Sequence, residues 1–183
     1  MTRSLRILAF AAFVPTLAFA HPGHAEHSGF GAGFLHPFGG ADHLLALVAV
    51  GMLAGRLEIR AMAALLGAWM CLLVGGMVAA TAGIELPAVR PLLVVSIGVS
   101  AMLALVLPKS PSRGLVGGIV ALASFFAFFH GYAHAERALA ASSETAFMVG
   151  IAAASALVLA LAAGIVRTLA RNVRATTTAG GAR

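Results

Sequence analysis

Charged residues are scarce in this chain: of its 183 residues only 10% are charged, whereas 61% are hydrophobic and the mean hydropathy is +1.00. An ordinary soluble domain is about 25% charged, so this composition excludes a water-soluble globular protein. It also excludes a disordered chain, because disorder combines low hydrophobicity with high net charge. A small membrane protein is the class that remains.

The scarcity of cysteine and the absence of other motifs exclude several kinds of functional site. The single cysteine, Cys71, cannot form an internal disulfide, and no CxxC pair is present for a thiolate zinc site or a redox site. No P-loop motif occurs, so the sequence gives no sign of ATP-driven work. Basic residues outnumber acidic ones, 12 to 6, but they are dispersed through apolar sequence and form no basic face. We therefore expect no nucleic-acid partner.

The N-terminus has the pattern of a secretory signal. Arg3 and Arg6 precede an apolar run over residues 7–19, and small residues lie near the end of this run, at Ala18 and Ala20. The run has about 13 residues, too few to cross a hydrocarbon core that needs about 20. We predict a cleavable signal peptide over residues 1–20.

Five hydrophobic spans follow, each of about 20 residues, which is the length that a helix needs to cross a bilayer. The predicted fold class is therefore all-α, a polytopic membrane bundle of five transmembrane helices within residues 38–166. The predicted spans are residues 38–55, 61–83, 91–107, 114–133 and 146–166. Residues 21–37 are predicted to form a His-rich extracytoplasmic segment, and residues 167–183 a basic cytoplasmic tail.

The basic residues orient these spans. They concentrate in the loops after the first and third spans and in the tail after the fifth: Arg56, Arg60, Lys109, Arg113, Arg167, Arg171 and Arg174. Only Arg90 and Arg137 lie in the opposite loops. The positive-inside rule then predicts a protein of the bacterial inner (cytoplasmic) membrane, with a periplasmic mature N-terminus and a cytoplasmic C-terminus.

Under this topology all seven histidines lie on the outer side. His130 and His134 are four residues apart, so a helix presents both from one face. His36 and His43 are seven apart and share a face if the helix begins early enough, although Pro37 indicates an irregular entry. Ionisable residues inside a membrane are costly and usually face a bundle interior or a wet cavity. The predicted metal-binding residues are His36, Asp42, His43, His130, His134 and Glu136.

Structural hydrogen bonding is the alternative explanation of this cluster. Asp42 is either an oxygen ligand or an acceptor that orients an imidazole. Imidazole and carboxylate without thiolate suit Ni²⁺, Co²⁺, Cu²⁺ or Zn²⁺. A second, weaker set of candidates, for metal capture, lies in the N-terminal segment: His21, His24 and His27. Short His-rich tracts often bind metal without a dedicated role.

Two motifs within this cluster resemble those of the HupE/UreJ family, small membrane proteins of hydrogenase and urease gene clusters. HPFGGADHLL at residues 36–45 resembles the signature of the family's first helix, and FHGYAHAE at residues 129–136 resembles its second, histidine-rich signature. The resemblance extends over essentially the whole chain. It implies a nickel permease that supplies hydrogenase or urease maturation proteins, with the same six polar residues as the metal path.

Two other functions use the same residues. A membrane-embedded metal hydrolase would activate water at the His/Asp cluster, with Asp42 or Glu136 as general base. A haem protein would use His43 and His130 as axial ligands from two helices. We favour the permease, assign no catalytic residue and predict that the protein is not an enzyme, because carboxylates around a histidine cluster at a surface mouth suit ion entry.

Overall fold

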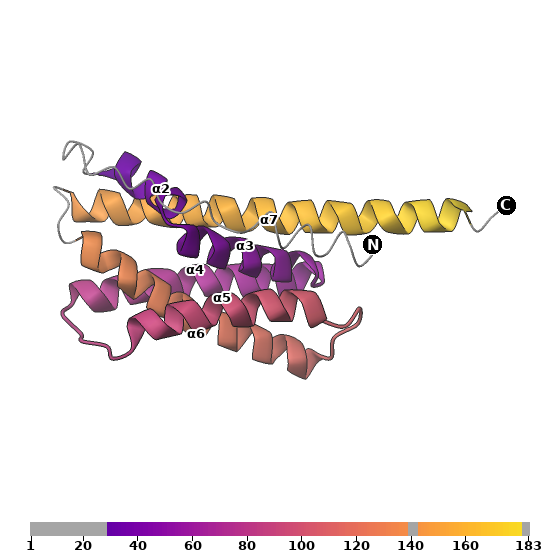
Figure 1. Ribbon diagram of the computed structural model, residues 1–183, viewed down its shortest axis with the longest axis horizontal. Helices are drawn as coiled ribbons and strands as arrows, with labels where there is room; N and C mark the ends of the chain where they lie inside the picture. The colour runs from indigo at the N-terminus through magenta and orange to yellow at the C-terminus, as the bar shows by residue number, and fades with distance from the viewer. Residues whose placement is uncertain (1–28, 139–142, 181–183) are drawn as a thin grey trace.

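The computed structural model describes residues 29–138 and 143–180, with side chains for all of these except residues 136–138 and 173–180. The predicted signal peptide and His21, His24 and His27 lie outside the described residues, and Glu136 lies within them without a described side chain. Within the described part all regular secondary structure is α-helical, and no strand occurs. The predicted all-α class is confirmed. The helices are α2 (Phe30–Gly39), α3 (Ala41–Gly55), α4 (Ile59–Thr81), α5 (Val89–Val106), α6 (Arg113–Ala138) and α7 (Glu144–Gly180) (Figure 1).

Four of these helices, α4 to α7, are long and apolar enough to span a membrane by themselves. The helices α2 and α3 reach that standard only as a pair, and they meet at an angle of 84°. The described residues therefore contain four candidate spans, or five if the bent pair counts as one. This agrees with a polytopic membrane bundle, in which every backbone polar group in lipid must be satisfied within a helix.

The first predicted span, residues 38–55, needs a correction. It is not one continuous helix, because Gly40 adopts an extended conformation (φ −123°, ψ 117°) between α2 and α3. An extended residue interrupts the helical hydrogen-bond ladder and turns the chain. Residues 30–37 were predicted to precede the bundle. In the structure they form most of α2, which packs along α7.

Close backbone contacts at glycines hold the helices together. A Cβ at Gly33 of α2 would overlap the carbonyl oxygen of Phe147 on α7, and one at Gly150 of α7 would overlap that of Phe30. Between α4 and α6, a Cβ at Gly131 would overlap the carbonyl oxygen of Leu73. Small residues allow such approach in lipid, where packing replaces the hydrophobic effect as the driving force.

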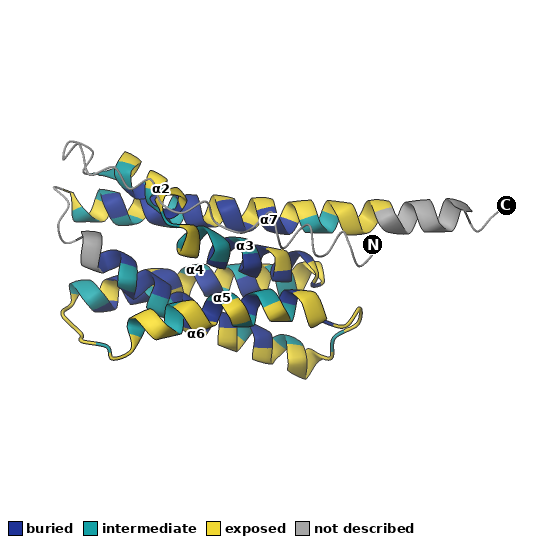
Figure 2. Cartoon of the chain, in the orientation of Figure 1, coloured by how far each residue is buried: buried dark blue, intermediate teal, exposed yellow. Residues whose placement is uncertain are grey.

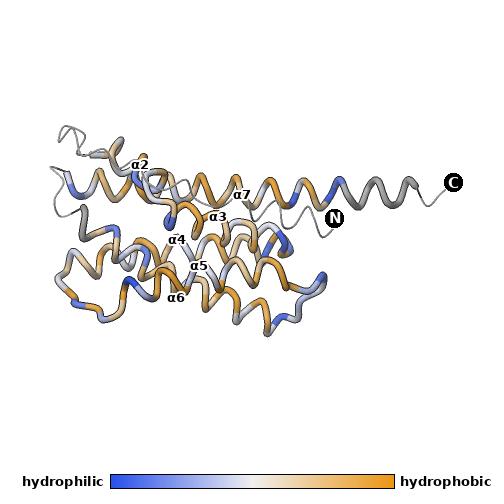
Figure 3. Tube along the Cα trace, viewed as in Figure 1, coloured by the Kyte–Doolittle hydropathy of each residue, from blue (hydrophilic) through white to orange (hydrophobic). Residues whose placement is uncertain are grey.

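The core lies where α3 and α4 meet the other helices, around Leu53, Leu65, Trp69 and Leu73, each 2% exposed or less. Large apolar residues are also exposed along the outer faces of the helices (Figures 2 and 3). A soluble protein would rarely expose so much contiguous apolar surface, whereas lipid covers it. The protein is accordingly a membrane protein. Its last helix, α7, continues past residue 167, where the basic tail was predicted to start, as far as Gly180.

Candidate metal site

The candidate site lies at the bend around Gly40. His36 lies near the end of α2, and Asp42 and His43 lie in the first turn of α3. Because the two helices meet at 84°, the chain folds His36 back to within 5.7 Å of His43, measured between ring centroids. The proximity that the sequence suggested for these histidines is present, but it arises from two helices and not from one helical face.

Three histidines converge at this bend. One nitrogen from each of His36, His43 and His134 lies within 4.8 Å of the others. The ring centroid of His134 is 4.5 Å from that of His43 and 5.1 Å from that of His36. His134 comes from α6 and is 3% exposed, whereas the other two are partly buried. Three nitrogens so close together can hold one divalent ion and leave coordination positions open.

Asp42 orients one of these imidazoles. Its Oδ1 lies 3.0 Å from Nδ1 of His43. A carboxylate only accepts hydrogen bonds when ionised, so Nδ1 of His43 carries the proton and donates it. The lone pair then resides on Nε2, which is left for a metal ion. A carboxylate bonded to an imidazole in this way is a common arrangement around metal-binding histidines.

His130 stands beside the group of three and not within it. It is 5% exposed, and its ring centroid lies 6.2 Å from that of His43. Its Nε2 is 2.8 Å from Oγ of Ser96, whose hydroxyl donates to the carbonyl oxygen of Leu93 at 2.6 Å. The serine hydroxyl has one proton, and it donates this proton in the hydrogen bond to the carbonyl oxygen of Leu93. In the other hydrogen bond, Nε2–H of His130 is therefore the donor and the serine oxygen is the acceptor.

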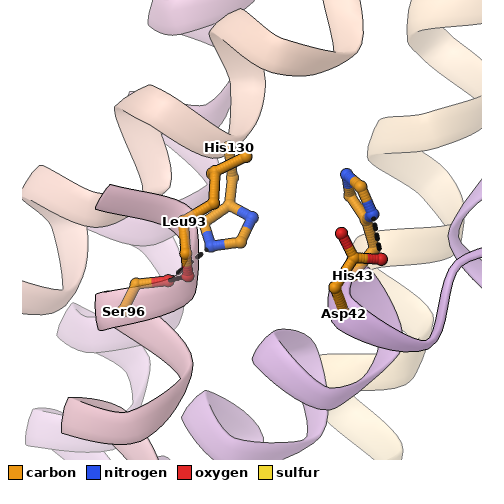
Figure 4. Close-up of polar contacts among 5 residues, drawn as sticks. All are labelled: Asp42, His43, Leu93, Ser96 and His130. Atoms are coloured by element: carbon orange, nitrogen blue, oxygen red, sulfur yellow. Dashed lines mark hydrogen bonds and ion pairs between the residues drawn. The ribbon is translucent and has the colours of Figure 1, made fainter. Parts of the chain in front are cut away.

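This hydrogen bond fixes the histidine tautomer. With the proton on Nε2, the lone pair of His130 is on Nδ1, the nitrogen that faces Asp42 and His43 across the gap in Figure 4. His130 is thus oriented by α5 toward the same space that the other histidines border. The two α6 histidines share a helix face and both lie near His43, but their other neighbours differ: His134 lies beside His36, and His130 beside Ser96 and Trp69.

A pocket of about 410 Å³ opens between α2, α3, α5 and α6 at this place. Its polar wall consists of His36, Asp42, His43, Arg90 and His130. Apolar residues of α5, among them Leu93 and Ile97, line the remainder. The pocket joins the bend, the histidines and the start of α5 in one space.

Two residues at this place were not among the predicted site residues. Ser96 contacts His130, and Arg90, predicted only as a basic residue of an outer loop, lines the pocket. The sequence offers a faint signal for the first: Ser96 and Ser100 are four residues apart in an otherwise apolar helix, and both are 3% exposed. Nothing in the sequence signals that Arg90 lines the pocket.

Comparison with known proteins agrees with this architecture. Residues 8–183 match the family described as HupE / UreJ protein. The chain is 34% identical over 155 residues to "Protein HupE" of Rhizobium leguminosarum bv. viciae, an alignment that covers 83% of this chain and 77% of that protein. No solved structure matches the chain. The family match extends over nearly the whole sequence and includes both histidine motifs, so the chain belongs to the HupE/UreJ family.

Proposed function

We propose that the protein is a secondary permease for a divalent transition metal, with Ni²⁺ as the first candidate, and that it supplies hydrogenase or urease maturation proteins. Membership of the HupE/UreJ family supports an accessory role in nickel transport in general. One observation carries the proposal: nitrogens of His36, His43 and His134 converge within 4.8 Å inside a membrane protein. Ionisable groups are costly there, and they commonly mark an ion pathway.

The composition of the site suits a transported ion. Imidazole nitrogens bind Ni²⁺, Co²⁺, Cu²⁺ and Zn²⁺, so the last three remain alternatives. A permease must bind its ion tightly enough to select it and loosely enough to release it. Three histidines leave open positions where water or another ligand can exchange. Asp42, one of the two bases considered for a hydrolase beside Glu136, bonds to His43 and orients it.

The placement of charge supports a site that faces the periplasm. The histidines lie at the end of the bundle where α6 finishes and α7 begins. Arg56 follows the end of α3, and Arg113 begins α6, so both lie toward the opposite end. The positive-inside rule assigns that basic end to the cytoplasm of a bacterium. In this orientation the site receives metal from the periplasm and delivers it toward the cytoplasm.

Metal accumulation tests the proposal. Cells with and without the protein are supplied in turn with nickel, cobalt, copper and zinc, and the metal content of washed cells is measured by mass spectrometry. We expect the protein to raise nickel content and to leave the others less affected. Equal contents of every metal in both kinds of cell would contradict a permease.

The role of Ser96 gives a second expected result. Ser96→Ala removes the acceptor for Nε2–H of His130, so the ring loses its fixed tautomer and orientation. Loss of such an outer partner weakens metal binding by roughly 10–100-fold. We expect the half-saturating nickel concentration for uptake to rise by that factor, and Ser96→Thr, which keeps the hydroxyl, to restore much of it.

Ser124→Ala is the matched control. Ser124 is also buried, at 6% exposure, but its Oγ has no hydrogen-bond partner within the described part of the chain. The same loss of a hydroxyl should therefore leave uptake unchanged. Wild-type uptake in Ser96→Ala would show that Ser96 does not position His130.

A further inference from the structure

Arg90 differs from Arg56 and Arg167 in its surroundings. It is exposed at the start of α5 and lines the pocket with His36, Asp42 and His43. Arg56 and Arg167 instead donate to backbone carbonyl oxygens. No hydrogen bond or ion pair of Arg90 occurs among the side chains that the structure describes, those of residues 29–135 and 143–172. The positive-inside pattern does not account for it either, since it lies at the histidine end.

The guanidinium of Arg90 repels a bare cation in this pocket. Arginine stays protonated in proteins, so its charge is permanent. Among the residues whose side chains the structure describes, the pocket wall carries one carboxylate, Asp42, and one guanidinium, Arg90. The positive charge of Arg90 weakens the attraction that this wall exerts on a bare divalent ion. A carboxylate on the incoming ligand, by contrast, matches the planar guanidinium in charge and in geometry.

The size of the pocket also exceeds that of a hydrated ion. Each water occupies about 30 Å³ in the liquid, so six waters around an ion occupy roughly 180 Å³. The pocket, at about 410 Å³, is more than twice as large. That volume lies within the range of about 300–1,000 Å³ typical of sites for small organic molecules.

We propose that the pocket recognises the metal as a complex with a small carboxylate chelator, of the chemical class of citrate. The imidazoles of His36 and His43 contact the metal at positions that the chelator leaves open, and Arg90 binds an outer carboxylate of the chelator. This inference rests on the proposed permease function and names the substrate class of the same site.

Transport by the purified full-length protein in liposomes tests the proposal. Radiolabelled nickel is supplied alone, with citrate, or with EDTA, at equal total nickel. Citrate leaves coordination positions for imidazole, whereas EDTA fills the coordination sphere. We expect uptake to persist with citrate, although free nickel falls, and to cease with EDTA.

Variants at Arg90 complete the experiment. Arg90→Gln should reduce the citrate-supported uptake by roughly 10–100-fold, the value of one charge-assisted contact, and should lower that uptake far more than it changes uptake from nickel alone. Arg90→Lys should be intermediate, because lysine offers a point charge without the planar fork. A size-exclusion profile and a thermal unfolding midpoint in detergent equal to those of the wild type show that this variant is folded.

A binding measurement on the unaltered protein provides a test that needs no variant. Radiolabelled citrate should bind to the protein only when nickel is present. Two results together would overturn the chelate proposal and leave the permease intact. Citrate would suppress uptake as EDTA does, and citrate binding would be absent or independent of nickel. Absence of uptake with nickel alone as well as with citrate would overturn the permease itself.

Discussion

Replacement of His43 by alanine is expected to lower nickel accumulation to that of cells without the protein. His43 is the residue where the contacts of the site meet: its ring centroid lies 4.5 Å from that of His134 and 5.7 Å from that of His36. Its removal deletes one of three converging nitrogens and leaves Asp42 without the imidazole that it orients. Loss of an outer partner alone costs about 10–100-fold in affinity. Loss of a ligand should therefore raise the half-saturating nickel concentration by more than about 100-fold.

The matched control is His24→Ala, which removes a histidine from the N-terminal segment outside the described residues. Uptake of radiolabelled nickel is measured for both variants at several concentrations, and the amount of protein in the membrane is determined for each. We expect His24→Ala to retain uptake at saturating nickel. The converse pattern, with uptake lost in His24→Ala and kept in His43→Ala, would move the essential site to the N-terminal segment.

Much of the bundle could be predicted from the sequence, because a membrane span depends on local hydropathy. The spans predicted over residues 61–83 and 91–107 correspond to α4 (Ile59–Thr81) and α5 (Val89–Val106) within two residues at each end. The histidines could likewise be singled out, since polar residues are rare in apolar helices. These signals lie in short stretches of chain and need no knowledge of how the helices pack.

The geometry of the site could not be predicted in the same way. Pro37 and Gly40 signal a break in the first span, but not its direction or its 84° angle. That angle depends on α2 packing against α7 through Gly33 and Gly150, which are distant in sequence. The bond between Ser96 and His130 joins residues 34 positions apart. Such contacts depend on helix packing, and no local pattern encodes them.

The opposite end of the bundle gives the other large effect, on stability. Arg56 donates from its guanidinium to the carbonyl oxygens of Ala104 and Leu107, at the end of α5. The last carbonyl groups of a helix lack partners within the helix, and cationic side chains there also favour the helix dipole. Arg56 thus joins the loop after α3 to the end of α5. We expect Arg56→Met to lower the free energy of unfolding by about 2–4 kcal/mol, since a hydrogen bond from a charged group contributes about 1.5–3 kcal/mol.

Arg60→Met is the control that distinguishes the loss of these two hydrogen bonds from the loss of a positive charge. Arg60 lies at the same end, begins α4 with Ile59, and has no hydrogen bond or ion pair within the described residues. Both variants lose one positive charge from the end that orients the protein, but only Arg56→Met loses the two carbonyl contacts. Thermal unfolding in detergent should show a midpoint several degrees lower for Arg56→Met than for Arg60→Met. Equal midpoints would mean that Arg56, like Arg60, contributes only charge, and that α5 ends stably without it.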